Sequence, residues 1–548
     1  YSYGADITSA FITGFVNGSA YGNYTKGKND FGLEYNINLR DYDNRIVDKI
    51  YEYDLNNLRY RSAKQQKDHF GYTDQNITAR YTNAETGKYA FQAKLNLNIS
   101  DSFSNGNGQS VFSQGNLQNE HGTVHNRASN YLNPTLDLYY SKNIGKKDEL
   151  SLNLVGSHYD TNSTQFDREW ILNSNQDVFN NDMILKAKQN GIVAEVAHSH
   201  SFEKRKLNSR YRISNKSISN DLQNLAGNSN YTVNYLQQYL YTEYSGKKDK
   251  FTYRLGLGLT NIHNKSAETT FDEWAFTPKI VLGYQLKNNQ SIRFSSSYIP
   301  QSPSSDALSS NVVQVVPNIV RTGNPYLKSQ HSFGNNLVYS FNSKYFDLNA
   351  NAFYWFRNRA SNQYYVLNQN VDGYLLTYEN AKNSQQYGIQ LTGSVKPFGN
   401  NLLVVKMVVA PATEQLTTSR GYTFKNNYIG NYFNISTEYK SFSAQYQFNI
   451  PYYTINGAFL STNENASHFF ASYKLREWSF TAGMYWIGVP SGYNTESQSE
   501  SLVNYTQHTQ IFNNKNMFVL GLSYDLSSGK KLQIQKKLEN STAPAATF

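Results

Sequence analysis

His198 and His200 are the residues of this chain whose type and spacing come closest to a metal site. They lie two residues apart in the segment Ile192 to Phe202, which reads as a β-strand, so both rings leave the same face. Glu195 lies on the opposite face, which leaves the histidine face without a third ligand. We therefore expect no metal centre in this strand.

A second candidate is the acidic run Asp41-Tyr42-Asp43-Asn44, followed by Asp48, whose oxygens are of the kind that bind a hard cation. The run lacks the glycine and the closing glutamate of an EF-hand loop, so we interpret it as a solvated loop. Serine and histidine occur elsewhere, but no nucleophile-elbow pattern or fixed spacing joins them. We expect no catalytic residue, no cofactor and no enzyme activity.

Large aromatic side chains fall in or beside the long polar stretches of the chain. Four of them, Trp170, Trp274, Tyr364 and Tyr365, are our candidates for residues that face a ligand. A large exposed ring usually has a reason to be there. Stacking on a ligand is one reason, packing against neighbouring loops is another, and both interpretations stay open at this point.

These side chains must be positioned by strands, because the dominant pattern of the sequence is a two-residue alternation. Apolar and polar residues alternate from Phe31 to Arg40, again from Phe91 to Ser100, and near the end from Met517 to Leu526. Because the pattern repeats every two residues, one face of such a strand is apolar and the other is polar. Strands of about ten residues are the length that a tilted strand needs to cross a bilayer. The pattern predicts a transmembrane β-barrel.

The composition agrees with a barrel. A mean hydropathy of −0.64 argues against membrane-spanning helices, but a barrel needs apolar residues on one face only. The 46 Tyr and 31 Phe fit the aromatic girdles of outer-membrane barrels. There is no cysteine, so neither a disulfide nor a thiolate metal site is available. The net charge is +10, but the basic residues are scattered; we expect contact with anionic lipid headgroups and not with nucleic acid.

Short polar turns divide the chain into long hairpins. About ten such turns recur, between polar stretches of uneven length at 41–74, 101–132, 161–190, 300–332 and 489–515, which we expect to be extracellular loops. Ten turns and the strand that precedes them give about 21 strands, whereas single-chain bacterial barrels have even numbers. We therefore predict an all-β fold: one large antiparallel barrel of about 22 strands, with short periplasmic turns.

The ends of the barrel follow from this count. We assign residues 1–526 to the barrel and residues 527–548 to a periplasmic C-terminal tail. The first strand lies either before Tyr1 or within the weakly patterned first residues, and the first of these positions is our expectation.

One loop carries a motif. Residues 298–332 open with Pro303-Ser304 and end with Gly323-Asn324-Pro325-Tyr326-Leu327-Lys328. With the closing strand and the strand count, this loop resembles the barrel domain of TonB-dependent outer-membrane receptors, especially the branch common in Bacteroidota. Ser329 and Gln330 stand where that family often has Pro and Glu. The prolines lead us to expect that the loop dips into the lumen.

The resemblance implies a protein of the Gram-negative outer membrane, which binds a substrate with its extracellular loops and imports it. It also implies a plug and a segment that contacts TonB, which would lie before Tyr1. The alternative is a barrel of the same shape that does not transport and serves as a scaffold or accessory subunit of an envelope complex. Outer-membrane lipids are expected partners in both cases, with a surface lipoprotein or other envelope subunits as further candidates.

Overall fold

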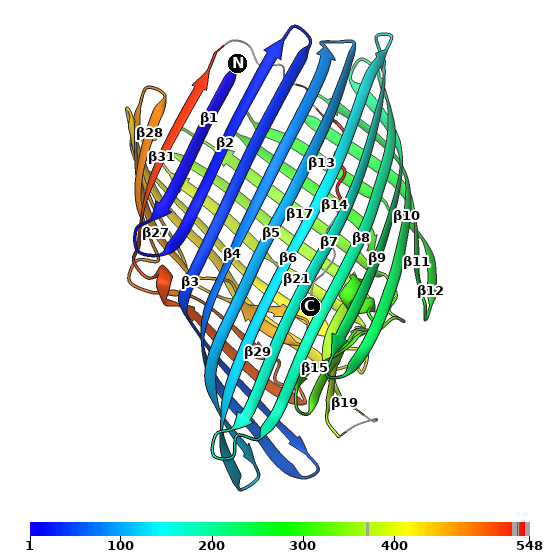
Figure 1. The fold of residues 1–548 in the computed structure, drawn as a ribbon. Helices are drawn as coiled ribbons and strands as arrows, with labels where there is room; N and C mark the ends of the chain where they lie inside the picture. Colours follow the sequence, from blue (N-terminus) through cyan, green and yellow to red (C-terminus); the bar gives the residue numbers. More distant parts are fainter. Residues whose placement is uncertain (369–371, 529–533, 535, 543–548) are drawn as a thin grey trace.

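The computed structural model describes residues 1–368, 372–528, 534 and 536–542. The chain forms one closed antiparallel barrel of 22 strands (Figure 1). The barrel strands, in order round the wall, are β1 (Ser2–Ala10), β2 (Gly14–Lys26), β3 (Asn29–Leu55), β4 (Leu58–Glu85), β5 (Tyr89–Gln114), β6 (Leu117–Ile144), β7 (Asp148–Ile171), β8 (Asp177–Ser201), β9 (Arg205–Asn224), β10 (Gly227–Lys248), β11 (Phe251–Ser266), β13 (Lys279–Lys287), β14 (Gln290–Gln301), β17 (Gln330–Asn342), β18 (Phe346–Asn358), β21 (Asn383–Val395), β22 (Val404–Thr417), β23 (Thr423–Tyr439), β24 (Phe442–Asn449), β27 (Ala466–Leu475), β28 (Trp478–Tyr485) and β31 (Met517–Ser527).

The first and last strands close the barrel. Ser2 to Ala10 of β1 pair with Val519 to Ser527 of β31, and the other edge of β1 pairs with β2. The first barrel strand therefore lies within the chain and not before Tyr1. Its pattern is weak because Gly4 and Ala5 interrupt the alternation with small side chains. A plug before Tyr1 remains a prediction.

The alternation of the sequence maps directly onto the two faces of the wall. On β7, Ser151 and Asn153 are buried on the inner side, whereas Leu152 and Leu154 are each 42% exposed on the outer side. A polar inner face and an apolar outer face are what a membrane barrel requires. Among the described residues, no helix combines the length and the apolar character needed to cross a membrane.

The two ends of the barrel differ. At one end the strands are joined by short turns, such as those at Gly27 and Gly87, where φ is +61° and +77° (top of Figure 1). At the other end, β3 to β8 continue as hairpins of 24 to 28 residues per strand (bottom of Figure 1). We call these the short-turn end and the hairpin end. Most of the stretches 41–74, 101–132 and 161–190, expected to be loops, are therefore paired strands.

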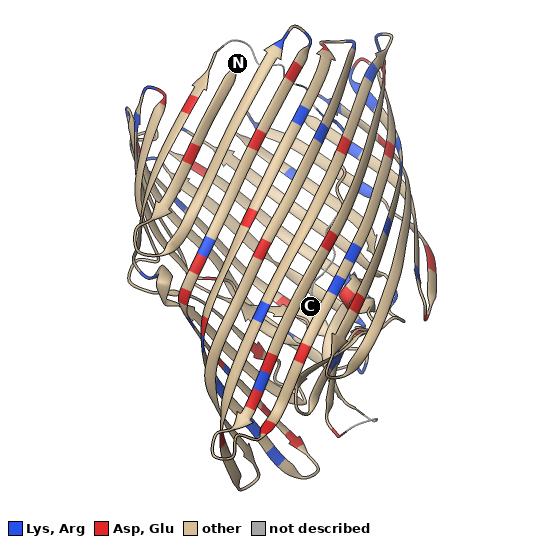
Figure 2. Cartoon of the chain, in the orientation of Figure 1, with Lys and Arg blue, Asp and Glu red and all other residues tan. Residues whose placement is uncertain are grey.

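Charged residues occur along the whole wall and at both of its ends. Figure 2 shows Lys and Arg at several short turns and both signs of charge on the strand extensions at the hairpin end. Smaller elements complete the hairpin end: β12 (Thr270–Phe276), β25 (Tyr453–Asn456), β26 (Phe459–Thr462), β29 (Ser491–Ser497), β30 (Val503–Ile511) and the 3₁₀ helix η1 (Phe512–Asn514). Of the predicted tail, residues 529–533, 535 and 543–548 lie outside the described part of the chain.

Candidate functional site

A second, smaller sheet lies inside the barrel. Its four strands are β15 (Val312–Val316), β16 (Ile319–Thr322), β20 (Tyr374–Asn380) and β19 (Ser361–Leu367), in this order. They belong to two segments, residues 302–329 between β14 and β17 and residues 359–382 between β18 and β21, and the pair β16 and β20 that joins the segments is parallel. We call these two segments, which include helix α1 (Ser305–Leu308), the in-folded segments.

One side of the in-folded segments packs on the inner wall at β7, β9 and β10. Leu308 of α1 and Leu327 are almost fully buried in one cluster with Ile218 and neighbouring wall residues. The hydroxyl of Tyr235 on β10 donates a hydrogen bond to the carbonyl of Pro303 at 3.1 Å. Burial of each leucine contributes about 1.5–3 kcal/mol, so this contact holds residues 302–329 inside the lumen, where the prolines had led us to expect them.

The other side packs on β3 and β30. Ile319 is fully buried in a cluster with Tyr53 of β3 and Val503 of β30. The hydroxyl of Tyr374 donates to the carbonyl of Asp54. Because the in-folded segments leave the wall between β14 and β21, on the opposite side of the 22-stranded wall from β3, they reach across the lumen.

The motif residues of the first segment have structural roles. A Cβ on Gly323 would lie 2.5 Å from the carbonyl oxygens of Asp306 and Ser309, so only glycine allows α1 to approach this closely. The backbone N–H of Asn324 donates to the carbonyl of Ala307 at 2.6 Å, and its side chain donates to the carbonyl of Tyr378 at 3.0 Å. Pro325 lies in the turn that follows Asn324. The motif therefore joins α1, β16 and β20.

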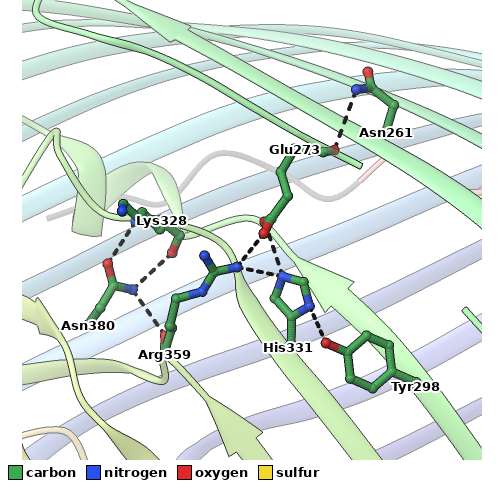
Figure 3. Close-up of polar contacts among 7 residues, drawn as sticks. All are labelled: Asn261, Glu273, Tyr298, Lys328, His331, Arg359 and Asn380. Atoms are coloured by element: carbon green, nitrogen blue, oxygen red, sulfur yellow. Dashed lines mark hydrogen bonds and ion pairs between the residues drawn. The ribbon is translucent and has the colours of Figure 1, made fainter. Parts of the chain in front are cut away.

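Both in-folded segments leave the wall at one polar cluster, shown in Figure 3. Asn380 ties the segments together: its side chain accepts from the N–H of Lys328 at 2.8 Å and donates to the carbonyls of Lys328 and Arg359 at 2.9 and 3.0 Å. The guanidinium of Arg359 contacts Glu273 of β12, and His331 of β17 contacts the other oxygen of the same carboxylate at 3.1 Å. We call Glu273, His331, Arg359 and Asn380 the root cluster.

A pocket of about 290 Å³ opens between the in-folded sheet and three hairpin tips. Tyr364, Tyr365 and Glu379 line it from the sheet, while Arg420 and Gln498 line it from the tips. The structure thus brings two of the four predicted ligand-facing aromatics together. Arg420 and Gln498 had no signal in the sequence, because they lie in polar hairpin tips that resemble all the others.

The polar groups of this pocket are held in place. Glu379 is buried and accepts hydrogen bonds from the side chain of Asn362 at 3.2 Å and from the hydroxyl of Ser419. The guanidinium of Arg420 lies 5.5 Å from the centre of the Tyr364 ring. Within the described part of the chain, the buried Oε1 of Gln498 has no hydrogen-bond partner. Since an unsatisfied acceptor is costly to bury, this oxygen is a place for a ligand donor or a water.

The pocket therefore offers an aromatic face, a cation, a fixed carboxylate and a free acceptor. Burial raises the pKa of Tyr365, so this residue stays a neutral phenol and its hydroxyl can donate or accept. Such a set suits a polar ligand with several hydroxyl or amide groups.

The two predicted tryptophans lie elsewhere. The ring of Trp170 covers Gly122 of the neighbouring strand, and the guanidinium of Arg168 lies 4.7 Å from its centre, so Trp170 packs within the wall. Trp274 is 61% exposed on β12. Neither residue lines the pocket of Tyr364 and Tyr365.

Two lysines face each other on the inner side of the strand extensions. Lys49 of β3 and Lys64 of β4 are directly opposite in the ladder. Burial lowers the pKa of both side chains. The carboxylates of Asp68 and Asp167 act on both lysines in the opposite direction, so the chain itself supplies anionic groups beside this pair.

The other polar candidates are engaged within the chain. Asp148 accepts hydrogen bonds from His198 and His200 at 3.0 and 2.8 Å. In the acidic run, Asp43 accepts from Asn513 at 2.8 Å. Over the described residues, no group of three or more metal-ligating His, Cys, Asp or Glu side chains forms.

Solved structures share this fold. The ferric enterobactin receptor of Pseudomonas aeruginosa is 10% identical, with a TM-score of 0.57 over 96% of this chain and 80% of the receptor. The copper transporter OprC is 10% identical, with a TM-score of 0.65 over 96% and 83%. The FrpB iron transporter of Neisseria meningitidis is 12% identical, with a TM-score of 0.55 over 96% and 82%.

Sequence comparison gives the family. No curated protein sequence matches the chain. The family model that describes the outer membrane protein beta-barrel family matches residues 142–524, which is most of the wall. The chain therefore belongs to the outer membrane protein β-barrel family and is a barrel of the Gram-negative outer membrane.

Proposed function

We propose that this chain is the barrel of a TonB-dependent receptor-like transporter, which binds a substrate at its extracellular face and imports it through the lumen. The observation that carries the proposal is the in-folded sheet, which reaches across the lumen and forms one wall of the pocket. A ligand in this pocket touches the element that obstructs its path. Binding and opening can then be coupled if the ligand prefers one position of the sheet.

The pocket indicates the kind of substrate. Tyr364 and Tyr365 offer ring faces, and Arg420, Glu379 and Gln498 offer groups for hydrogen bonds. At about 290 Å³ the pocket holds a small ligand or one end of a larger one. A sugar or a short peptide meets both requirements, and we propose that the substrate is of this polar, multiply hydrogen-bonding class.

The energy for import would come from partners outside this sequence. On our proposal, a plug and a TonB-contacting segment precede Tyr1. Movement of the plug then opens the part of the lumen that the in-folded segments do not fill. The similar solved structures are a receptor and transporters by description, and they share the fold with this chain. Because one fold serves many functions, this likeness supports a barrel of that kind without naming its substrate.

A growth experiment tests import. A strain that lacks the protein and the same strain complemented with the full-length protein are compared in media that are each limited by one nutrient. We expect slower growth of the lacking strain on at least one sugar or peptide source. Equal growth on every limiting nutrient would contradict import and would leave the scaffold of an envelope complex as the better interpretation.

A further inference from the structure

The chain returns into the barrel after its last strand. Residues 536–542 lie along the inner wall formed by β6, β7 and β8 (red in Figure 1). The wall residues that they contact, such as Asn153, belong to the inner face, since Leu152 and Leu154 on either side of Asn153 face outward. We call residues 536–542 the luminal tail.

Two lysines at the start of the luminal tail form ion pairs with the wall. Lys536 pairs with Asp137 of β6, and Lys537 pairs with Glu149 of β7. The ammonium of Lys536 also lies 5.8 Å from the centre of the Tyr139 ring, whose hydroxyl accepts a hydrogen bond from the backbone N–H of Lys537 at 3.3 Å. The side chains of Lys536 and Asp137 are only 14% and 17% exposed, so solvent screens this pair less than a surface pair.

The end of the luminal tail binds the wall through its own neutral side chains, those of Asn540 and Thr542. The side chain of Asn540 donates to Asn153 of β7 and to Glu195 of β8, at 2.8 Å in both cases. The hydroxyl of Thr542 donates to the hydroxyl of Ser157, further along β7. The order of these contacts along the tail is the order of their partners along β7, so the tail runs parallel to β7, away from the periplasmic end.

The wall is organised to receive this segment. The side chain of Asn153 donates to Oδ1 of Asp137 at 2.6 Å and to the carbonyl of Leu138 at 2.9 Å. These two hydrogen bonds direct the side-chain oxygen of Asn153 towards the tail, and Oδ2 of Asp137 accepts from Lys536. Between the lysines and Asn540, Leu538 is only 4% exposed. The wall thus pairs with the charged residues of the tail and forms hydrogen bonds with its polar residues, while the apolar residue of the tail, Leu538, is buried.

We propose that the inner wall of β6, β7 and β8 is a binding site for an extended, lysine-containing peptide, and that its occupant is the luminal tail of this chain. Two carboxylates, those of Asp137 and Glu149, supply the anionic partners of the lysines, whereas Glu195, which also pairs with Arg210 at 3.6 Å, accepts a hydrogen bond from Asn540. Ion pairs select the lysines, and the hydrogen bonds to Asn540 and Thr542 fix the register of the peptide.

This site has a consequence for the lumen. The luminal tail occupies the periplasmic half of the lumen, whereas the in-folded segments lie towards the extracellular side. Anything that moves along the wall at β6 to β8 must displace the tail. The inference does not depend on import, because a barrel that only scaffolds would hold its tail in the same way.

Disulfide trapping tests the site in the full-length protein in outer membranes. The chain has no cysteine, so any disulfide that forms within it must join the two introduced cysteines. The test pair is Ser157→Cys with Thr542→Cys. The control pair is Ser19→Cys with Thr542→Cys, because Ser19 faces the lumen from β2, at another part of the wall. We expect the test pair to close at least about tenfold faster than the control pair. Equal rates, or no closure of the test pair, would overturn the inference.

Charge reversal tests the chemistry. Lys536→Glu with Lys537→Glu, added to the test pair, is expected to slow closure by roughly tenfold or more, because both ion pairs become repulsions. Asp137→Lys with Glu149→Lys should then restore it. A rate of disulfide closure that is the same whatever the signs of these charges would contradict recognition of the lysines by the wall. Heat-modifiable migration in gels shows for each variant that the barrel itself has assembled.

Discussion

Arg359 and Glu273 are joined by a contact of 2.6 Å between guanidinium and carboxylate, and this contact connects the interior of the barrel to its extracellular rim. Arg359 begins the second in-folded segment, and Glu273 lies on β12, a short strand beside β11. His331, the second residue of β17, contacts the same carboxylate (Figure 3). The carboxylate therefore holds Arg359, and Arg359 in turn donates a hydrogen bond to Nε2 of His331 at 2.6 Å, so this chain of contacts ties together the places where both in-folded segments meet the wall.

Replacement of this carboxylate by Glu273→Gln should loosen the in-folded sheet. The change keeps the shape of the side chain but leaves the guanidinium of Arg359 without its anion, a loss of about 1–3 kcal/mol for a partly buried group. We expect amide hydrogen exchange in β16 and β20 to become roughly tenfold faster. Glu85→Gln is the control, because Glu85 pairs with the exposed Lys28 at a periplasmic turn, where solvent screens the pair. Unchanged exchange in the Glu273 variant would show that the root cluster does not hold the sheet.

Gly323→Ala should displace helix α1. The new Cβ would lie 2.5 Å from the carbonyl oxygens of Asp306 and Ser309, and these backbone atoms cannot move without the helix. We expect a cost of about 1–3 kcal/mol and faster protease cleavage within residues 302–329 of the assembled barrel. In the control Gly156→Ala, the new Cβ has nothing within 4 Å. Equal cleavage of the two variants would contradict the close approach of α1 to Gly323.

The wall of the barrel could be predicted from the sequence because its physics is local. Each membrane-crossing strand must put one face into lipid, so the alternation in Phe31 to Arg40 appears at every crossing. The ten predicted turns lie at or within a few residues of the turns in the structure, such as those at Gly27 and Gly87.

The strand extensions and the in-folded sheet could not be predicted in this way. The extensions of β3 to β8 meet water on the outside and a mixture of polar and apolar residues on the inside, such as Asp68 of β4 and Tyr53 of β3, so their alternation is less regular than that of the membrane-crossing parts. The strand Val312–Val316 is apolar without alternation, because it lies between the wall and other in-folded strands. The root cluster joins Glu273 to Arg359 across 86 residues, and no local signal relates two such positions.

Substitutions in the pocket should affect ligand binding and not assembly. Arg420→Ala and Tyr364→Ala each remove a group that lines the pocket, and neither residue is fully buried, so we expect an assembled barrel that binds its substrate at least roughly tenfold more weakly. The measurement is growth on the nutrient for which the lacking strain shows a deficit. Trp274→Ala is the matched control, since this exposed aromatic lies outside the pocket. A growth defect of the Trp274 variant alone would move the binding site to β12.

Deletion of residues 303–322 should open the lumen. It removes α1, β15 and β16, and with them the cluster contacts of Leu308 and Ile319 on both parts of the wall. We expect the ionic conductance of the barrel in planar bilayers, measured in potassium chloride, to rise severalfold. Leu327→Ala is a milder test, because the loss of one buried leucine, about 2–5 kcal/mol, should produce intermittent openings of similar size. Conductance that is unchanged in both variants would show that other parts of the lumen set its resistance.

Removal of β1 should prevent assembly of the barrel. Without residues 2–10, β2 and β31 become edges whose backbone groups face lipid, and each unsatisfied group there costs several kcal/mol. We expect loss of the heat-modifiable gel band and degradation of the chain in cells. Deletion of residues 536–542 is the control, since the luminal tail contacts the inner wall but no strand edge. A variant without β1 that still migrates as a compact barrel would mean that β2 and β31 can pair directly, and that a closed wall of one strand fewer is stable in this family.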